Sequence, residues 1–260
     1  MTIRALEVLA AADVVACEDT RVTGKLLAMH GVRASLTPYH EHNARRARPQ
    51  LIARIARGEA VALAADAGTP LISDPGYRLV SEALAGGLAV TAVPGASAPI
   101  AALTVSGLPT DRFLFAGFLP PRKAARRKAL AEIAGVGATL VMLESPRRLA
   151  AALADMAEVL GARPAAVARE LTKRFEEVRR GSLADLARHY DEAGAPKGEI
   201  VVVVGGPPAN AEPDAEDVDT RLRAALATQS VRDAASAVAA ATGLPRRRLY
   251  ARALVLSRRR

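Results

Sequence analysis

Residues 66–76 read Asp-Ala-Gly-Thr-Pro-Leu-Ile-Ser-Asp-Pro-Gly, and this is the most informative stretch of the chain. It directly follows the apolar run Val-Ala-Leu-Ala-Ala at 61–65, which predicts a buried strand. Two glycines and two prolines then predict a tight loop, because glycine permits backbone angles that a Cβ forbids and proline fixes its own φ. Such a loop at the carboxyl end of a strand is where α/β proteins usually bind ligands. The alternative is an ordinary connection between a strand and a helix, made of turn-forming residues.

The segments around this loop alternate between strand-like and helix-like runs. Strands are predicted at 13–17, 35–38, 61–65 and 88–93, and helices at 6–12, 22–29, 44–57, 77–85 and 96–106. This alternation predicts an α/β fold with a mainly parallel sheet and helices on its faces. Leu108-Pro109-Thr110 indicates a junction, so a first domain is predicted over residues 1–108 and a second over 109–206.

The second half of the chain also predicts an α/β domain, with some antiparallel pairing near 175–181. Its strands are predicted at 112–117, 139–143, 165–169, 175–181 and 199–204, and its helices at 122–133, 147–160 and 183–191. An acidic, proline-containing linker is predicted at 207–218. A small helical module at 219–260 follows, with helices at 220–228, 231–241 and 245–257. Gly243 is expected to end the second of these helices and Pro245 to begin the third. This break indicates either a helix–turn–helix bundle or a small appendage that only packs on the rest of the protein.

Composition and charge limit the classes of function that this chain can have. Half of the 260 residues are apolar, which is enough for a sizeable core. The net charge is +9, and residues 219–260 carry ten arginines against Asp219 and Asp233. This balance indicates a polyanionic partner, or else a solvated surface rich in arginine. The lone Cys17 excludes an internal disulfide and a cysteine-cluster metal site. No leader and no membrane span are expected, which predicts a cytoplasmic protein.

Seven motifs occur in one order along the chain. They are Glu18-Asp19-Thr20-Arg21, Tyr39-His40-Glu41-His42-Asn43, the loop at 66–76, Pro94-Gly95-Ala96-Ser97-Ala98, Phe115-Ala116-Gly117-Phe118-Leu119-Pro120, Glu144-Ser145-Pro146-Arg147-Arg148 and Arg169-Glu170-Leu171-Thr172-Lys173. Together with Gly198-Glu199, they make residues 2–206 resemble the tetrapyrrole-methylase family, and specifically its branch that methylates 16S ribosomal RNA. The basic module at the end of the chain is of the type that this branch carries.

The resemblance implies a two-domain fold of the class III methyltransferases that binds S-adenosylmethionine in a cleft between the domains. It also implies a homodimer that acts on 16S rRNA or the small ribosomal subunit, at the 2′-oxygen of a cytidine ribose. The residues that it places at the cofactor are Asp66, Ala67, Gly68, Thr69, Pro70, Ser97, Ala98, Leu143, Glu144 and Ser145. Backbone groups in glycine-rich turns can bond the adenine edge, and a carboxylate can accept from the ammonium group of the ligand.

Other motifs point to the side of the site that faces RNA. The residues expected to bind the substrate are Arg21, His40, Glu41, His42, Asn43, Arg122, Lys123, Arg126, Arg127 and Lys173. The histidine cluster is a poor metal site, because no cysteine or further histidine lies near it in the sequence, and no metal is expected. The basic residues at 122–128 are expected to cover one helical face, which either binds phosphate or is simply solvated. Lys173 could equally belong to a surface ion pair.

The expected reaction is an in-line attack by a ribose 2′-oxygen on the sulfonium methyl group. Alignment in a shielded site supplies much of the rate, and a base must accept the hydroxyl proton. The candidates are Glu18, Asp19, Glu144 and Glu170, and the sequence does not choose among them. Asp19 or Thr20 could instead cap a helix. A tetrapyrrole C-methyltransferase and a non-enzymatic RNA-binding factor are the alternative functions.

One departure from the family concerns the start of the chain. The family begins with an apolar strand and a cofactor-binding loop, whereas Met1–Leu6 here aligns with the helix after that loop. A missing first strand is therefore expected to leave backbone groups of its neighbours unpaired and a groove in the first sheet.

Overall fold

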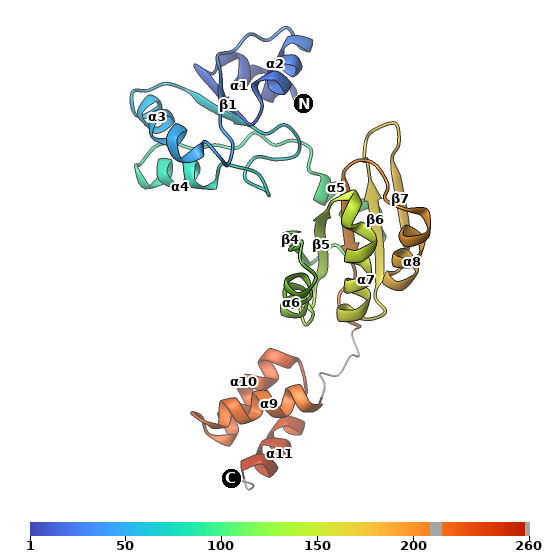
Figure 1. Cartoon of the computed structure of the whole chain (residues 1–260). Helices are drawn as coiled ribbons and strands as arrows, with labels where there is room; N and C mark the ends of the chain where they lie inside the picture. The colour runs from blue at the N-terminus through green and yellow to red at the C-terminus, as the bar shows by residue number, and fades with distance from the viewer. Residues whose placement is uncertain (209–214, 258–260) are drawn as a thin grey trace. The chain divides into compact units, whose positions relative to one another are not determined.

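The computed structural model describes residues 1–208 and 215–257 (Figure 1). The chain divides into two compact units, Met1–Pro207 and Pro208–Arg260, which are described separately below. The first unit contains two β-sheets with helices packed on them, and the second is a bundle of helices. The fold class is therefore the predicted α/β architecture with a helical module at its end.

The first sheet is parallel and has the strand order β2-β1-β3. Its strands are β1 (Val14–Cys17), β2 (Leu36–Pro38) and β3 (Val61–Ala64), and its helices are α1 (Ile3–Ala11), α2 (Thr20–Met29), α3 (Ala44–Ala56) and α4 (Tyr77–Ala85). β1 is central, and Val15 pairs with Leu36 on one side and with Ala62 on the other. All four residues of β1 are buried, as expected for an uninterrupted apolar run in a parallel sheet.

The strand predicted at 88–93 does not form, and this prediction is wrong. Residues 88–97 have no regular secondary structure, and Val90 is 45% exposed. Within the described residues, β3 pairs only with β1, so its other edge has no neighbouring strand. A strand needs a partner to satisfy its backbone groups, and without one an apolar segment stays irregular.

The second sheet is larger and mixed, with the strand order β4-β5-β8-β6-β7. Its strands are β4 (Phe113–Phe118), β5 (Thr139–Glu144), β6 (Pro164–Arg169), β7 (Glu177–Ser182) and β8 (Ile200–Val204). β4 and β5 are parallel, and the pairs β5–β8, β8–β6 and β6–β7 are antiparallel. The antiparallel pairing predicted near 175–181 is thereby confirmed.

Helices cover both faces of this second sheet, which explains why its central strands are apolar on both sides. They are α5 (Ala98–Ser106), α6 (Lys123–Ile133), the short 3-10 helix η1 (Pro146–Arg148), α7 (Leu149–Leu160) and α8 (Leu183–Ala193). α6, α7 and α8 form one core with Met142 and Val202, whereas α5 packs on the other face against Val141 and Val203. The alternation along β5 and β8 therefore fills two cores at once.

The second unit contains α9 (Ala215–Leu226), α10 (Val231–Thr242) and α11 (Arg246–Ser257). Their core is formed by Leu222, Ala235, Leu249 and Ala253, among other apolar side chains. Gly243 ends α10 with φ of +70°, a conformation that glycine adopts without the cost of a Cβ. The linker predicted at 207–218 is too long, because α9 already begins at Ala215, and the remainder of that prediction at 209–214 lies outside the described residues.

No helix among the described residues is long and apolar enough to cross a membrane.

Candidate functional site

The carboxyl ends of the three strands in the first sheet bring three of the predicted motifs to one edge. Parallel strands end on the same side, so the segments after Cys17, Pro38 and Ala64 are neighbours. The backbone N–H of Asp19 donates to Asp66 Oδ1 at 3.3 Å, which joins two of these segments directly. The loop at 66–76 therefore lies at the sheet edge where α/β proteins usually bind ligands.

The loop at 66–76 has an unusual backbone. Gly68 and Gly76 have positive φ, and so do Leu71 at +73° and Ser73 at +63°. A side chain in this region of φ costs about 1–3 kcal/mol, and such residues cluster at functional sites. Gly76 has φ of +138°, a conformation that favours glycine, and a Cβ there would also lie 2.6 Å from the Leu63 side chain. The stability of the rest of the fold must offset the cost of these φ angles, which a simple turn between a strand and a helix does not require.

The predicted cofactor residues of the first half lie in or beside this loop. The chain from Asp66 to Thr69 is exposed, and Thr69 Oγ1 donates to the Ala96 carbonyl at 3.5 Å. This contact places the turn before Ser97 and Ala98 next to the loop. A Cβ at Gly117 of β4 would lie 3.2 Å from Ser73 Oγ, so the loop also contacts the second sheet.

Asp74 is a site residue that the sequence reasoning missed. It is partly buried in the loop, and burial raises its pKa; the nearby carboxylates of Glu18 and Asp66 raise it further. Three carboxyl groups therefore share this edge of the first sheet, and they favour a positively charged ligand or a proton between them. The signal in the sequence was Asp74-Pro75 directly before the glycine that ends the loop.

Asp19 serves first as a helix cap. Its side chain accepts from the backbone N–H of Arg21 at the start of α2, which confirms the capping alternative. Arg21 also donates to it from the side chain, with Nη2 2.6 Å from Oδ2. The Arg21 hydrogen bonds lower the pKa of Asp19 to about 2, which makes it a weak proton acceptor. The Arg21 side chain remains largely exposed.

The residues His40–Asn43 form a tight loop that Asn43 closes. Asn43 Oδ1 accepts from the His40 N–H at 2.9 Å, and Asn43 Nδ2 donates to the Pro38 carbonyl at 2.8 Å. The rings of His40 and His42 meet edge to face with centroids 6.0 Å apart. His40 Nδ1 is buried and has no hydrogen-bond partner among the described residues. Glu41 and His42 are exposed beside it and are free to contact a substrate.

The second sheet presents a matching edge at the carboxyl ends of β5 and β6. Glu144 ends β5 as a buried carboxylate: its Oε1 lies 2.7 Å from Arg148 Nη2 and accepts from the Ser145 N–H at 2.7 Å. Its Oε2 is buried without a hydrogen-bond partner among the described residues. A buried polar atom without a partner indicates a group that a ligand can satisfy. Leu143 and Ser145 beside it are partly buried.

Glu170 and Lys173 form an ion-paired cluster at this edge. Lys173 Nζ lies 2.8 Å from Glu170 and 3.0 Å from Glu199, and the Glu199 N–H also donates to Glu170. The hydrogen bond from Lys173, followed by that from the Glu199 backbone, lowers the pKa of Glu170. A Cβ at Gly198 would lie 2.3 Å from the Glu170 side chain, which explains the glycine before β8. The positive φ of Glu170 and Thr172 marks a second strained loop.

The basic helix α6 differs from its prediction. Arg126 is buried and bonded to Asp155 of α7, with Nη2 2.5 Å from Oδ2, so the prediction that it shares an exposed basic face is wrong. Helical spacing predicts which residues share a face, but it does not reveal that Asp155 on the neighbouring helix pairs with one of them. Arg127 is partly buried and pairs with Asp155 and Glu158. Arg122 and Lys123 are exposed.

Comparisons with known proteins agree with this geometry. The family model for tetrapyrrole (corrin/porphyrin) methylases matches residues 1–187, and a model described as the RsmI C-terminal HTH domain matches residues 212–257. Ribosomal RNA small subunit methyltransferase I of Mesorhizobium japonicum is 55% identical over 257 residues, which cover 98% of this chain and 87% of that protein. The protein of the same name from Erythrobacter litoralis is 54% identical over 256 residues, which cover 98% of this chain and 90% of that protein.

Among solved structures, the uroporphyrin-III C-methyltransferase of Thermus thermophilus complexed with S-adenosyl homocysteine has the same fold. It is 22% identical with a TM-score of 0.52, and the match covers 78% of this chain and 90% of that one. The resemblance inferred from the seven motifs is thereby confirmed: the chain belongs to the tetrapyrrole methylase family and, within it, to the family of ribosomal RNA small subunit methyltransferase I.

Proposed function

We propose that this chain transfers a methyl group from S-adenosylmethionine to the 2′-oxygen of a cytidine ribose in 16S ribosomal RNA. The observation that carries the proposal is the identity of 55% and 54%, over nearly the whole chain, to two ribosomal RNA small subunit methyltransferases I. The choice of atom and nucleotide rests on the branch of the family that the seven motifs resemble. A homodimer in the cytoplasm belongs to the same proposal.

The residues at the two sheet edges suit S-adenosylmethionine. The exposed backbone at 66–69 and the orphaned Oε2 of Glu144 offer polar partners, and Asp66, Glu18 and Asp74 supply negative charge for a cationic ligand. When bound, this cofactor supplies a methyl group that its positively charged sulfur has already activated. The protein's share is then to orient the cofactor, exclude water and receive a proton.

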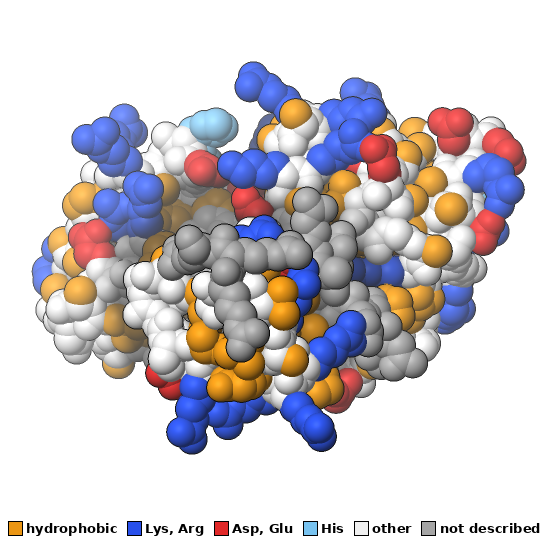
Figure 2. Space-filling view, turned by 90° about the horizontal axis from the view of Figure 1, so that it is seen from below, with side chains coloured by type: hydrophobic (Ala, Val, Ile, Leu, Met, Phe, Trp, Pro, Cys, Tyr) orange, Lys and Arg blue, Asp and Glu red, His pale blue; other side chains and the backbone are white. Residues whose placement is uncertain are grey.

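The RNA is proposed to contact exposed basic and polar groups around this site. Arg122 and Lys123 are free to bind phosphate, and Glu41 and His42 project from the loop after β2. Figure 2 shows Lys and Arg side chains at several places on the face that it draws, and the net charge of the chain is +9. Such a surface attracts a polyanion through counterion release. Arg126 is left out of this surface because it is buried.

Glu18 is the proposed proton acceptor among the four candidates. Asp19 and Glu170 accept hydrogen bonds from Arg21 and Lys173, and Glu144 is paired with Arg148. Glu18, by contrast, is exposed and has no hydrogen bond or ion pair within the residues that the structure describes. Its neighbours Asp66 and Asp74 are carboxyl groups rather than cations. No ion pair in the described part of the chain holds the Glu18 carboxylate, so its oxygens are free to accept a hydrogen bond from a substrate hydroxyl.

The decisive experiment measures transfer of labelled methyl groups from S-adenosylmethionine to small-subunit rRNA and to assembled small subunits. We expect Glu18→Gln to lower kcat by about 10²- to 10⁴-fold, the usual range for removing a general base. Cofactor binding, followed by isothermal titration, should remain close to that of the unmodified chain. Glu7→Gln, an exposed glutamate of α1, is the matched control and should leave kcat unchanged. Full activity of Glu18→Gln would remove Glu18 from this role.

The same assay separates the alternative functions. A tetrapyrrole C-methyltransferase would label a corrin or porphyrin and not RNA, and its ligand binding would not weaken steeply with salt. RNA binding should weaken steeply, because each phosphate contact releases counterions. Binding of RNA with no label transfer, beside an active relative as positive control, would favour a non-enzymatic RNA-binding factor.

A further inference from the structure

The arginines of α11 lie on two flanks of the helix and have different surroundings. At 100° per residue, Arg246 and Tyr250 lie about 40° apart on one flank, and Arg248 and Arg252 lie about 40° apart on the other. The buried Leu249 separates the two flanks. The helix therefore presents two distinct basic surfaces, and only one of them is used for packing within the unit.

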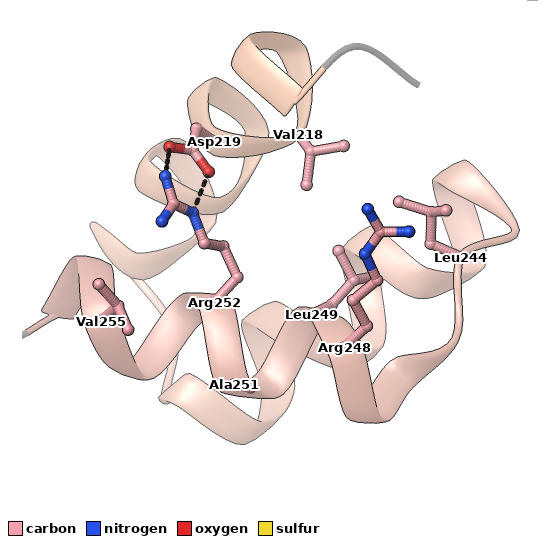
Figure 3. Close-up of a pocket in the computed structure, with 8 residues that line it drawn as sticks. All are labelled: Val218, Asp219, Leu244, Arg248, Leu249, Ala251, Arg252 and Val255. Atoms are coloured by element: carbon pink, nitrogen blue, oxygen red, sulfur yellow. Dashed lines mark hydrogen bonds and ion pairs between the residues drawn. The ribbon is translucent and has the colours of Figure 1, made fainter. Parts of the chain in front are cut away.

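The flank with Arg252 is occupied by the protein itself. Arg252 donates to both carboxylate oxygens of Asp219 on α9, at 2.7 and 2.5 Å, as Figure 3 shows. This pair lowers the pKa of Asp219. Apolar side chains such as Val218, Leu244 and Val255 line the same hollow (Figure 3). A bidentate ion pair between α9 and α11 joins these helices and already supplies Arg252 with an anionic partner.

The other flank contains what we call the arginine hollow, a surface depression of about 370 Å³ lined by Arg232, Arg246, Arg247 and Tyr250. All four residues are exposed, and the exposed fraction of Tyr250 is 41%. Among the described side chains, none forms a hydrogen bond or ion pair with the guanidinium of Arg232, Arg246 or Arg247. Three like charges gathered without an ion-pair partner among the described residues favour the binding of an anion.

We propose that the arginine hollow binds an unpaired segment of RNA. The three guanidinium groups bind neighbouring phosphates, and one base stacks on the ring of Tyr250. The inference rests on the proposed function, which makes RNA the substrate of this protein. It adds a second binding surface, in a unit separate from the two sheets, and names the residues that form it.

The aromatic ring is what favours an unpaired segment over a duplex. Arginines alone bind the phosphates of either form, whereas a base can stack on a side chain only when it is free of its own helix. Aromatic residues make up only 3% of the chain, so an exposed tyrosine among three arginines is an unusual combination here. Arg246, Arg247 and Tyr250 also lie in the first turns of the second helix of a helix–turn–helix arrangement, the part that reaches nucleic acid in that motif.

The first test compares two double variants of the full chain that lose the same charge from the same unit. Arg246→Gln with Arg247→Gln removes two members of the hollow, and Arg221→Gln with Arg223→Gln removes two arginines of α9. Binding of a short, unstructured, fluorescent RNA is measured by anisotropy over a range of salt concentrations. We expect the first pair to reduce the slope of log K against log salt by about 1.4, since each contact with a single strand contributes about 0.7. The α9 pair should change it little.

The second test isolates stacking. Tyr250→Ala should weaken binding of the unstructured RNA by roughly 5- to 100-fold, as expected for loss of one stacked base, with the salt slope unchanged. Tyr250→Phe should bind like the original chain, because its ring is retained. A blunt duplex of the same length should bind Tyr250→Ala and the original chain equally. Circular dichroism melts of every variant confirm that the helices remain folded.

The outcomes separate this inference from the proposed function. Equal slopes for the two arginine pairs would mean that charge acts diffusely and would overturn the hollow as a site. An unaffected Tyr250→Ala would overturn the stacked base, and tighter binding of the duplex would overturn the choice of an unpaired segment. If RNA binding behaves as expected but no methyl group is transferred, the proposed function fails while the hollow stands. If methyl transfer occurs and the hollow variants leave its KM unchanged, the hollow fails alone.

Discussion

The two sheets of the first unit differ in how firmly they are built. In the second sheet, Val141, Val202 and Val203 are fully buried between helices on both faces. In the first, every residue of β3 is only partly buried, and the neighbouring segment at 88–97 is irregular. Both edges nevertheless carry strained loops, with positive φ at Leu71 and Ser73 in one and at Glu170 and Thr172 in the other.

This difference shows two ways of supporting a binding edge. The second sheet anchors its loops with ion pairs such as Glu144–Arg148 and Glu170–Lys173, so its side chains are oriented before any ligand arrives. The first sheet supplies three carboxyl groups, Glu18, Asp66 and Asp74, that have no ion pair among the described residues, on a smaller core. We infer that the second sheet forms the more stable side of the site. The first sheet is less stable, because its carboxyl groups are placed for function and not for stability.

The largest expected effect comes from the buried ion pair of the second sheet's helices. Asp155→Ala leaves the Arg126 guanidinium buried without its partner, and this should lower the free energy of unfolding by about 3–5 kcal/mol. Glu82→Ala breaks the more exposed Arg48–Glu82 pair between α3 and α4 and should cost only about 0–1 kcal/mol. Urea denaturation followed by circular dichroism measures both. Equal losses would mean that the two regions do not differ in how much they rely on their ion pairs.

A smaller effect is expected at the glycine beneath the Glu170 loop. Gly198→Ala places a methyl group where Glu170 lies, at a residue whose φ is +100°, and should cost more than the roughly 1–3 kcal/mol of backbone strain. Gly194→Ala, with φ of +78° and nothing within 4 Å of its Cβ, is the matched control for strain alone. The difference between the two in urea denaturation reports the packing of Glu170. A Gly194→Ala variant as unstable as Gly198→Ala would show that this contact contributes nothing.

The smallest effect is expected at Asp74, and its sign is opposite. Folding raises the pKa of Asp74, so binding of its proton stabilises the folded state. This stabilisation is fully present below the ordinary pKa of the carboxyl group and is lost as the pH rises through the pKa of the folded state. Asp74→Asn removes the cost of charging the group, so it should raise the melting temperature at neutral pH and have little effect in acid. The exposed Asp111→Asn is the control. A lower melting temperature at neutral pH would contradict the repulsion among Asp74, Glu18 and Asp66.

Much of this fold could be predicted from local patterns. The apolar runs at 13–17 and 199–204 predicted strands close to the positions observed, and the loop at 66–76 was predicted to follow a strand, as it does, because each signal is contained within a few neighbouring residues. The segment at 88–93 shows the limit of such signals. Its residues favour a strand, but whether a strand forms depends on a neighbour with free backbone groups, and that information is not local.

The candidate site could be predicted in outline and not in detail. Motifs located the loops, yet the burial of Arg126 depends on Asp155, an acid on another helix. Likewise, the raised pKa of Asp74 arises first from its burial and then from Glu18, which is distant in sequence and comes close because β1 and β3 are adjacent. Partners that meet through tertiary structure decide which charged groups are free, and spacing along the chain does not reveal them.

The packing of α5 has a practical consequence for dividing the protein into fragments. This helix precedes the predicted junction at 108–109, yet Leu103 lies in the core of the second sheet, and Arg180 of β7 donates to the carbonyls of Val105 and Ser106. A fragment that starts at residue 109 would lack α5, which covers one face of the second sheet. The valine-rich face would then be exposed to solvent and prone to aggregation. A fragment that starts upstream of Ala98 retains α5, and expression trials should therefore begin there.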